Sequence, residues 1–283
     1  MNPNIKLKAY DVNGFRGGLD LEYVYSKFPG GEIHVKVLLP VCKEVTISAS
    51  ITNSDDLMAV LLLNNAIKNQ DKNVKIFLHL KYIPYQQQDR ICETGEALSI
   101  KLFADLINSC GFERVDVYDP HSDVATALIN NCRIYGIEKI LDFVNMQEFF
   151  SISKIWDVDI IVAPDAGSYK KVSKFSVGVG IPIVHATKDR VKGEVQKVTL
   201  HGDVAGKRCL VVDDICVGGR TFTELGKALK DARADKLYLY VTHGIFSKGI
   251  DELKTYYEEI YCTDSRPEAE VLGKEKKVTI IER

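Results

Sequence analysis

The stretch that decides the fold runs from residue 209 to 222 and reads Cys209-Leu210-Val211-Val212-Asp213-Asp214-Ile215-Cys216-Val217-Gly218-Gly219-Arg220-Thr221-Phe222. Its first four residues are apolar and predict a buried strand. Two acids follow at the carboxyl end of that strand, and a glycine loop leads into a helix that begins near Thr221. Ligands of open α/β sheets bind at the carboxyl ends of strands, and glycine N–H groups beside a helix N-terminus suit phosphate. The stretch therefore predicts a phosphate site next to paired carboxylates, which suit ribose hydroxyls or metal-bound water.

Outside this stretch, short β-branched runs alternate with amphipathic helical segments, which is typical of a parallel sheet covered by helices. We expect an α/β fold in two domains, at residues 1–137 and 138–283. The polar segment 187–197, which lies between two expected strands, is predicted to be a mobile loop. The other predicted strands cover 45–49, 74–80, 115–118, 160–163, 183–186, 208–212 and 236–241, and the predicted helices cover 54–68, 96–109, 169–177 and 221–232.

The composition is that of an ordinary globular protein, with 283 residues, 46% apolar and 27% charged. A formal charge of −2 provides no overall field for nucleic acid or an anionic membrane. The first residues contain no apolar segment of signal-peptide length, and the longest apolar run is too short to span a bilayer. The seven cysteines form no CxxC pair, which argues against a disulfide framework and a zinc site. We therefore expect a cytoplasmic protein with neither a nucleic-acid nor a membrane partner.

Two carboxylates and an imidazole follow other expected strands. Asp119 and His121 come just after one strand of the first half, and Asp165 comes just after a strand of the second half. Oxygen and imidazole ligands of this kind suit Mg²⁺ and polyphosphate oxygens. Asp119, His121 and Asp165 are therefore predicted metal ligands.

Eight further elements, taken in order, resemble motifs of the ribose-phosphate pyrophosphokinase (PRPP synthetase) family. They are FPGGE at 28–32, YIPYQQQDR at 82–90, GEALSIKL at 95–102, DPHS at 119–122, APDAG at 163–167, KDR at 188–190, GDVAGK at 202–207 and THGIFS at 242–247. The stretch 209–222 is similar to the PRPP-binding loop of type I phosphoribosyltransferase-fold proteins. The resemblance covers nearly the whole chain. It implies two type I phosphoribosyltransferase-like domains, each a mainly parallel sheet flanked by helices.

The resemblance also implies an activity, namely transfer of diphosphate from ATP to the anomeric hydroxyl of ribose 5-phosphate, with Mg²⁺ bound and AMP released. In that family the residues matching Lys188 and Arg190 are the main transition-state cations, so we expect them to be catalytic together with His121. Glu32 would complete the nucleotide site of a neighbouring subunit, which implies a dimer or a larger homo-oligomer. The expected ATP-binding residues are Glu32, Gln87, Gln88, Asp89, Arg90 and His121, and the expected acceptor-binding residues are Asp165, Asp213, Asp214, Gly218, Gly219, Arg220 and Thr221.

The chain also departs from the family. Its sugar-phosphate loop reads Val217-Gly218-Gly219-Arg220-Thr221 where the family has DTGGT or DTAGT, and on the nucleotide side Gly30 and Gln87 replace an Asp and an Arg. A loop that has lost a carboxylate and gained Arg220 suits a 5-diphosphate better than a lone monophosphate. One alternative acceptor is therefore ADP-ribose, which would give ADP-ribose 1-pyrophosphate for NAD salvage.

Two alternatives of other classes remain. One is a non-catalytic regulatory protein associated with PRPP synthetase, and the other is a protein that consumes or senses PRPP. The first is disfavoured because His121, Asp165, Lys188 and the paired aspartates are all present. The second would need only one such domain and no ATP-side motifs.

Overall fold

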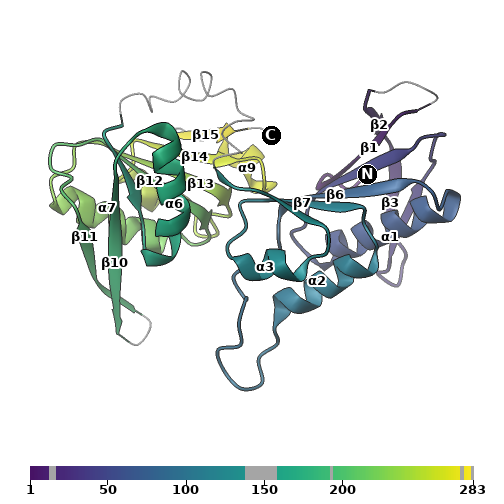
Figure 1. Ribbon diagram of the computed structural model, residues 1–283, viewed down its shortest axis with the longest axis horizontal. Coiled ribbons are helices and arrows are strands. Elements are labelled where there is room, and N and C mark those ends of the chain that lie inside the picture. The colour runs from purple at the N-terminus through teal and green to yellow at the C-terminus, as the bar shows by residue number, and fades with distance from the viewer. Residues whose placement is uncertain (13–16, 138–157, 192–193, 275–276, 282–283) are drawn as a thin grey trace. The chain divides into compact units, whose positions relative to one another are not determined.

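The computed structural model describes residues 1–12, 17–137, 158–191, 194–274 and 277–281 (Figure 1). The chain divides into two units, Met1–Tyr135 and Gly136–Arg283, and each is described by itself. All seven cysteines are free thiols. None of the helices in the described part of the chain is long and apolar enough to cross a membrane.

Unit 1 is built on a six-stranded sheet with the order β2-β1-β5-β6-β7-β8. Strands β5 to β8 pair in parallel, whereas β1 runs antiparallel to both of its neighbours. A separate antiparallel hairpin is formed by β3 and β4. The bounds are β1 Ile5–Tyr10, β2 Leu19–Leu21, β3 Tyr23–Lys27, β4 Ile33–Val37, β5 Glu44–Ser50, α1 Ser54–Gln70, β6 Lys75–Tyr82, α2 Ser99–Ser109, β7 Arg114–Tyr118, α3 Asp123–Leu128 and β8 Cys132–Tyr135.

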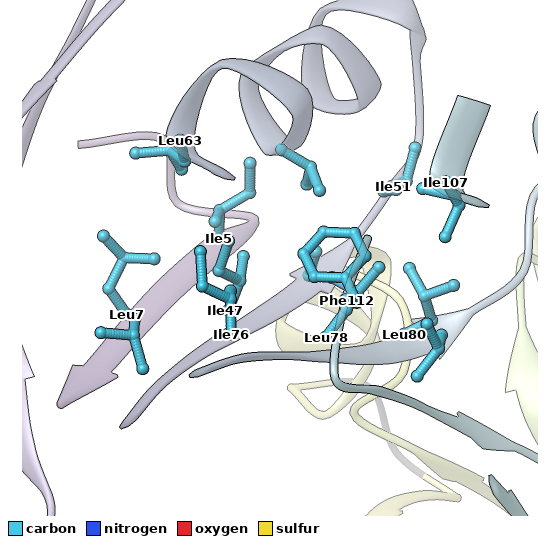
Figure 2. Close-up of a cluster of buried hydrophobic side chains, with 14 of the residues drawn as sticks. Ile5, Leu7, Ile47, Ile51, Leu63, Ile76, Leu78, Leu80, Ile107 and Phe112 are labelled. Atoms are coloured by element: carbon cyan, nitrogen blue, oxygen red, sulfur yellow. The ribbon is translucent and has the colours of Figure 1, made fainter. Parts of the chain in front are cut away.

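The core of unit 1 lies between this sheet and the helices α1 and α2, as Figure 2 shows. Alternate residues of β6, namely Ile76, Leu78 and Leu80, are almost completely buried on it. They meet Leu63 from α1 and Ile107 from α2. A fully buried Leu or Ile side chain contributes about 1.5–3 kcal/mol relative to an exposed one. This layer therefore fixes the position of β6, whose carboxyl end leads into the segment 83–98.

Unit 2 is built on a seven-stranded sheet with the order β11-β10-β9-β12-β13-β14-β15. All neighbouring strands pair in parallel except β10 and β11, which form an antiparallel hairpin. The bounds are β9 Ile160–Ala163, α6 Ala166–Val179, β10 Ile183–Val191, β11 Glu194–His201, β12 Cys209–Cys216, α7 Arg220–Asp231, β13 Leu237–Gly244, α8 Asp251–Lys254, β14 Glu259–Thr263, α9 Glu268–Leu272 and β15 Val278–Ile281.

Helices cover both faces of this second sheet. Val172 and Phe175 of α6 belong to one apolar cluster, and Phe222 and Leu225 of α7 belong to another on the opposite face. In the sheet, β10 lies on one side of β9, whereas β12 lies on the other side. The direction of winding therefore reverses between β9 and β12. Ligand crevices of open α/β sheets form at such a point, outside the carboxyl ends of the strands.

The α/β class with mainly parallel sheets is confirmed, but three local predictions were wrong. Asp213 and Asp214 lie within β12 rather than after it, because pairing with β13 continues to Cys216. The segment 187–197 is not a loop over its described residues. Pairing of β10 with β9 ends at His185, and β10 then continues as a hairpin with β11. The helix expected from residue 96 begins at Ser99, because the Glu96 carboxylate accepts the N–H groups of a preceding turn.

The packing of α7 against the segment after α8 predicts a selective effect of a methyl group. A Cβ at Gly226 would stand 2.8 Å from the Cβ of Tyr256 and 3.3 Å from the ring of Tyr257, whereas a Cβ at Gly178 in α6 would meet nothing within 4 Å. We expect Gly226→Ala to lower the free energy of unfolding by about 1–3 kcal/mol through overpacking. Gly178→Ala should raise it by about 0.5–1 kcal/mol. Urea unfolding of both variants measures this, and equal effects would contradict the packing.

Candidate active site

Three carboxylates gather at the carboxyl ends of β9 and β12. Asp165 follows β9 and caps α6, where its Oδ1 accepts the N–H of Ser168 at 3.0 Å. Asp213 and Asp214 are consecutive in β12, and Oδ1 of Asp213 accepts the N–H of Asp214 at 3.0 Å. Because β9 and β12 are paired neighbours, their ends lie at one edge of the sheet. The sheet topology thus brings together acids that are almost fifty residues apart in sequence.

The pKa of Asp213 reflects the electrostatics of this edge of the sheet. This pKa is raised well above the ordinary value, first by burial of the carboxyl and then by repulsion from Asp214 and Asp165. The edge therefore carries more negative charge than the surrounding protein neutralises. A cation or a hydroxyl donor that reached Asp213 would be bound favourably there.

Two lysines partly offset this charge. Nζ of Lys171, on α6, lies 2.9 Å from Oδ2 of the buried Asp214. Nζ of Lys188, on β10, lies 3.5 Å from Oδ2 of Asp165, and the Lys188 side chain is only 4% exposed. Sequence reasoning identified Lys188 but missed Lys171. No local signal marked Lys171, because its partner Asp214 lies 43 residues away in the sequence.

The glycine loop begins where β12 ends and leads into α7. Gly219 is the N-cap of α7 with φ of +80°, a left-handed conformation that favours glycine. Its carbonyl oxygen accepts the N–H groups of Phe222 at 2.9 Å and Thr223 at 3.0 Å, which forms the first turn of the helix. The helix that follows has twelve residues, so its N-terminal N–H groups carry a substantial dipole. This geometry suits an anionic oxygen.

A second segment supports that loop. The backbone N–H of Ser247 donates to the carbonyl oxygen of Val217 at 2.7 Å, and its hydroxyl donates to the same oxygen at 3.1 Å. The methylenes of Lys248 pass Gly218, lying 3.7 Å from the position of an ideal Cβ there. Lys248 and Arg220 are both exposed. The loop therefore carries two cationic side chains close to its glycines, of which sequence reasoning identified only Arg220.

In unit 1, a polar cluster joins the segment after β6 to the turn after β7. Oδ1 of Asp89 is 2.9 Å from Nε of Arg90, and the Asp89 side chain is 7% exposed. The hydrogen bond from Arg90, with the nearby charge of His121, lowers the pKa of Asp89. The N–H of His121 donates to Oε1 of Gln86 at 2.8 Å. The structure thus brings together three of the predicted ATP-binding residues, Asp89, Arg90 and His121.

Asp119 lies at the start of the same turn and is fully buried. It has a left-handed backbone with φ of +39°, and its N–H donates to the carbonyl oxygen of Tyr135 at 2.8 Å. A positive φ in a residue other than glycine is costly and is often found at functional sites.

The remaining predicted site residues differ in exposure, and the predicted metal ligands belong to different units. Gln87 and Gln88 are exposed, and Glu32 is exposed in the β3–β4 turn, where its carboxylate lies over Gly30. Asp119 and His121 belong to unit 1 and Asp165 to unit 2. The side chain of Arg190 lies outside the described residues. Within the described residues no group of three or more His, Cys, Asp or Glu side chains is arranged to hold a metal ion.

Known proteins share both the sequence and the fold. Residues 133–270 match the phosphoribosyl transferase domain, and residues 19–111 match the N-terminal domain of ribose phosphate pyrophosphokinase. The ribose-phosphate pyrophosphokinase of Pyrococcus furiosus is 29% identical over 85% of both chains. That of Thermosipho africanus is 28% identical over 93% of this chain and 84% of its own. Phosphoribosylpyrophosphate synthetase from Mycobacterium smegmatis superposes with a TM-score of 0.77 at 24% identity, covering 93% of this chain and 86% of its own.

These matches identify both the fold of unit 2 and the family of the chain. Unit 2 has a phosphoribosyltransferase-type fold, in which a glycine loop follows two acids at the end of a central strand. The chain belongs to the ribose-phosphate pyrophosphokinase family, a family of enzymes. The resemblance seen in the motifs is therefore confirmed.

The raised pKa of Asp213 predicts a stability that depends on pH. An unfolded Asp titrates near 3.9. Between that value and the raised folded pKa, the folded protein holds the extra proton, so stability falls as pH rises through this window. In EDTA, Asp213→Asn should therefore raise Tm by about 2–4 °C at pH 7–8 and by little at pH 4. Asp214→Asn is the matched control and should lower Tm, because it removes the charged partner of the Lys171–Asp214 ion pair. An Asp213→Asn Tm gain that did not vary with pH would contradict this electrostatic account.

Proposed function

We propose that the chain transfers diphosphate from ATP to the anomeric hydroxyl of ribose 5-phosphate and releases AMP. The observation that carries the proposal is the edge of unit 2, where Asp165, Asp213 and Asp214 lie with two lysines beside a glycine loop. Relatives that match most of the chain are named ribose-phosphate pyrophosphokinases, which supports the same reaction here.

The balance of bonds in this reaction sets what the site must do. The anomeric oxygen forms a bond to the β-phosphorus of ATP, and the bond from that phosphorus to the oxygen bridging the α-phosphorus breaks. AMP leaves with that oxygen, and the anomeric proton is released. Such transfers depend mainly on positioning and on neutralising phosphoryl charge. Carboxylates that orient a sugar and cations that face phosphoryl oxygens are therefore sufficient machinery.

Each part of the chain has a proposed task. Asp213 and Asp214 orient the ribose hydroxyls, and the N–H groups of 218–221 hold the 5-phosphate. Lys188 and Arg190 face the transferring phosphoryl group, with Lys188 moving from Asp165 toward the substrate. In unit 1, Gln87, Gln88, Asp89, Arg90 and His121 bind ATP, with Glu32 reaching the site of a neighbouring subunit in a homo-oligomer.

Mg²⁺ fits the chemistry of this edge. Burial and two neighbouring carboxylates already raise the pKa of Asp213, so a divalent cation there would relieve repulsion. Of the predicted metal ligands, Asp165 lies at this edge and is the residue of unit 2 that we propose to hold the ion, whereas Asp119 and His121 belong to unit 1. When bound, the ion supplies neutralisation of polyphosphate charge.

The first test concerns Lys188. Its charge acts mainly on the transition state, so Lys188→Ala should lower kcat at least about 100-fold with a modest change in KM for ATP. Lys197→Ala is the matched control, because Lys197 is an exposed lysine of the same hairpin. The measurement is the rate of AMP release that depends on the presence of the acceptor. Normal kcat in Lys188→Ala would remove this residue from the mechanism.

A second acceptor is favoured by one observation in the loop. Lys248 lies across Gly218 and Arg220 begins α7, so two exposed cations flank the glycines. A terminal phosphate concentrates a charge of about −1.5 to −2 on one group, whereas a 5-diphosphate spreads its charge over two phosphoryl groups, so that two separate cations can each bind one. ADP-ribose is an acceptor of that shape. Its product, ADP-ribose 1-pyrophosphate, would be an activated precursor for NAD salvage.

Arg220→Gly separates the two acceptors. A charge-assisted contact is worth about 1.5–3 kcal/mol, so its loss should lower kcat/KM for ADP-ribose about tenfold or more. The kcat/KM for ribose 5-phosphate should change much less. Steady-state assays with both acceptors, at the same ATP concentration, measure the ratio. Equal losses, or no turnover of ADP-ribose by the wild type, would exclude the diphosphate acceptor.

A further inference from the structure

Gln86 lies in the segment after β6 and points inward. Its side chain is fully buried, with 0% exposure, although Tyr85, Gln87 and Gln88 around it are exposed. The inward turn follows from the backbone, because Tyr85 has a left-handed φ of +61° and its carbonyl oxygen accepts the N–H of Gln88 at 2.8 Å. Three consecutive glutamines thus have different environments, and only the first is enclosed.

The two ends of the Gln86 amide differ. Oε1 accepts the backbone N–H of His121 at 2.8 Å, whereas Nε2 has no hydrogen-bond partner among the described residues. A buried amide nitrogen without a partner costs stability, and an apolar side chain of the same shape would avoid that cost. Stability alone therefore does not account for a glutamine here. The hydrogen bond that Oε1 of Gln86 accepts from the N–H of His121 does account for it.

The turn that Gln86 contacts is strained and is held at several points. Asp119 has φ of +39°, and its N–H is held by the carbonyl oxygen of Tyr135. Ser122, at the other end of the turn, is the N-cap residue of α3, which begins at Asp123. His121 lies between these two points, and its ring is exposed. The hydrogen bond from Gln86 therefore fixes the backbone of the one residue in the turn whose side chain faces solvent.

We propose that Gln86 is a positioning residue that sets the backbone at His121 and so aims the imidazole at the nucleotide. This inference rests on the proposed function for the nucleotide, but the hydrogen bond itself can be tested without catalysis. Gln86→Met keeps the length of the side chain and removes both the acceptor and the unpaired nitrogen. Stability and function should then change in opposite directions, which a purely structural residue would not produce.

The control is the same substitution at another glutamine. Oε1 of Gln70, at the end of α1, also accepts a backbone N–H, that of Leu39 at 3.0 Å, but lies outside the site. We expect Gln86→Met to keep or raise Tm and to lower kcat/KM for ATP about tenfold. It should also speed hydrogen exchange in a peptide covering 119–122. Gln70→Met should leave the kinetics and this peptide unchanged.

A double-mutant cycle shows whether Gln86 acts through His121. In a His121→Ala background, Gln86→Met should have little further effect on ATP affinity measured by calorimetry with Mg²⁺. Additive losses, or unchanged exchange at 119–122 in Gln86→Met, would overturn the inference. An inactive wild type with faster exchange in Gln86→Met would instead reject the proposed reaction and leave the positioning contact standing.

Discussion

Asp213 lies beside Asp214 in β12 and close to Asp165 after β9, and the burial of its carboxyl group together with the repulsion among the three carboxylates is the constraint on which unit 2 depends. The fold places them together because β9 and β12 are neighbours where the winding of the sheet reverses. Lys171 pairs with Asp214 and Lys188 approaches Asp165, so the remaining imbalance falls on Asp213. A site of this kind trades stability for affinity. Its negative charge is costly without a ligand and favourable once a cation or sugar hydroxyls bind.

The glycine loop supplies the opposite charge. Its backbone is fixed by Ser247, whose N–H and hydroxyl both donate to the carbonyl oxygen of Val217, so its N–H groups are oriented before a ligand arrives. Arg220 and Lys248 add charge at its mouth. In unit 1 the turn at 119–122 is held in a comparable way, by Gln86 and by the carbonyl oxygen of Tyr135. In both units the candidate site residues lie at a strand end, and a neighbouring loop fixes the backbone there.

Local patterns predicted much of the fold. The strand at 160–163 and the helices α1 and α7 follow from apolar runs and helical spacing and match the structure to within two residues. Strands β14 and β15 were missed, because their parallel pairing depends on partners distant in sequence. The motif residues Asp165, Lys188 and Asp213 were identified from their positions after strands and from the family motifs. Gln86 was not, because the backbone of Tyr85 decides which of three glutamines turns inward.

The proposed reaction transfers two phosphoryl groups of ATP to the acceptor together, as one diphosphate. The most direct measurement is mass spectrometry and chromatography of the products formed from ATP and ribose 5-phosphate, with Mg²⁺ and without it. We expect AMP to form only when both Mg²⁺ and an acceptor are present. The amount of AMP should equal the amount of sugar that has gained two phosphoryl groups. ADP with a singly phosphorylated product, or AMP release that does not require an acceptor, would contradict the proposed reaction.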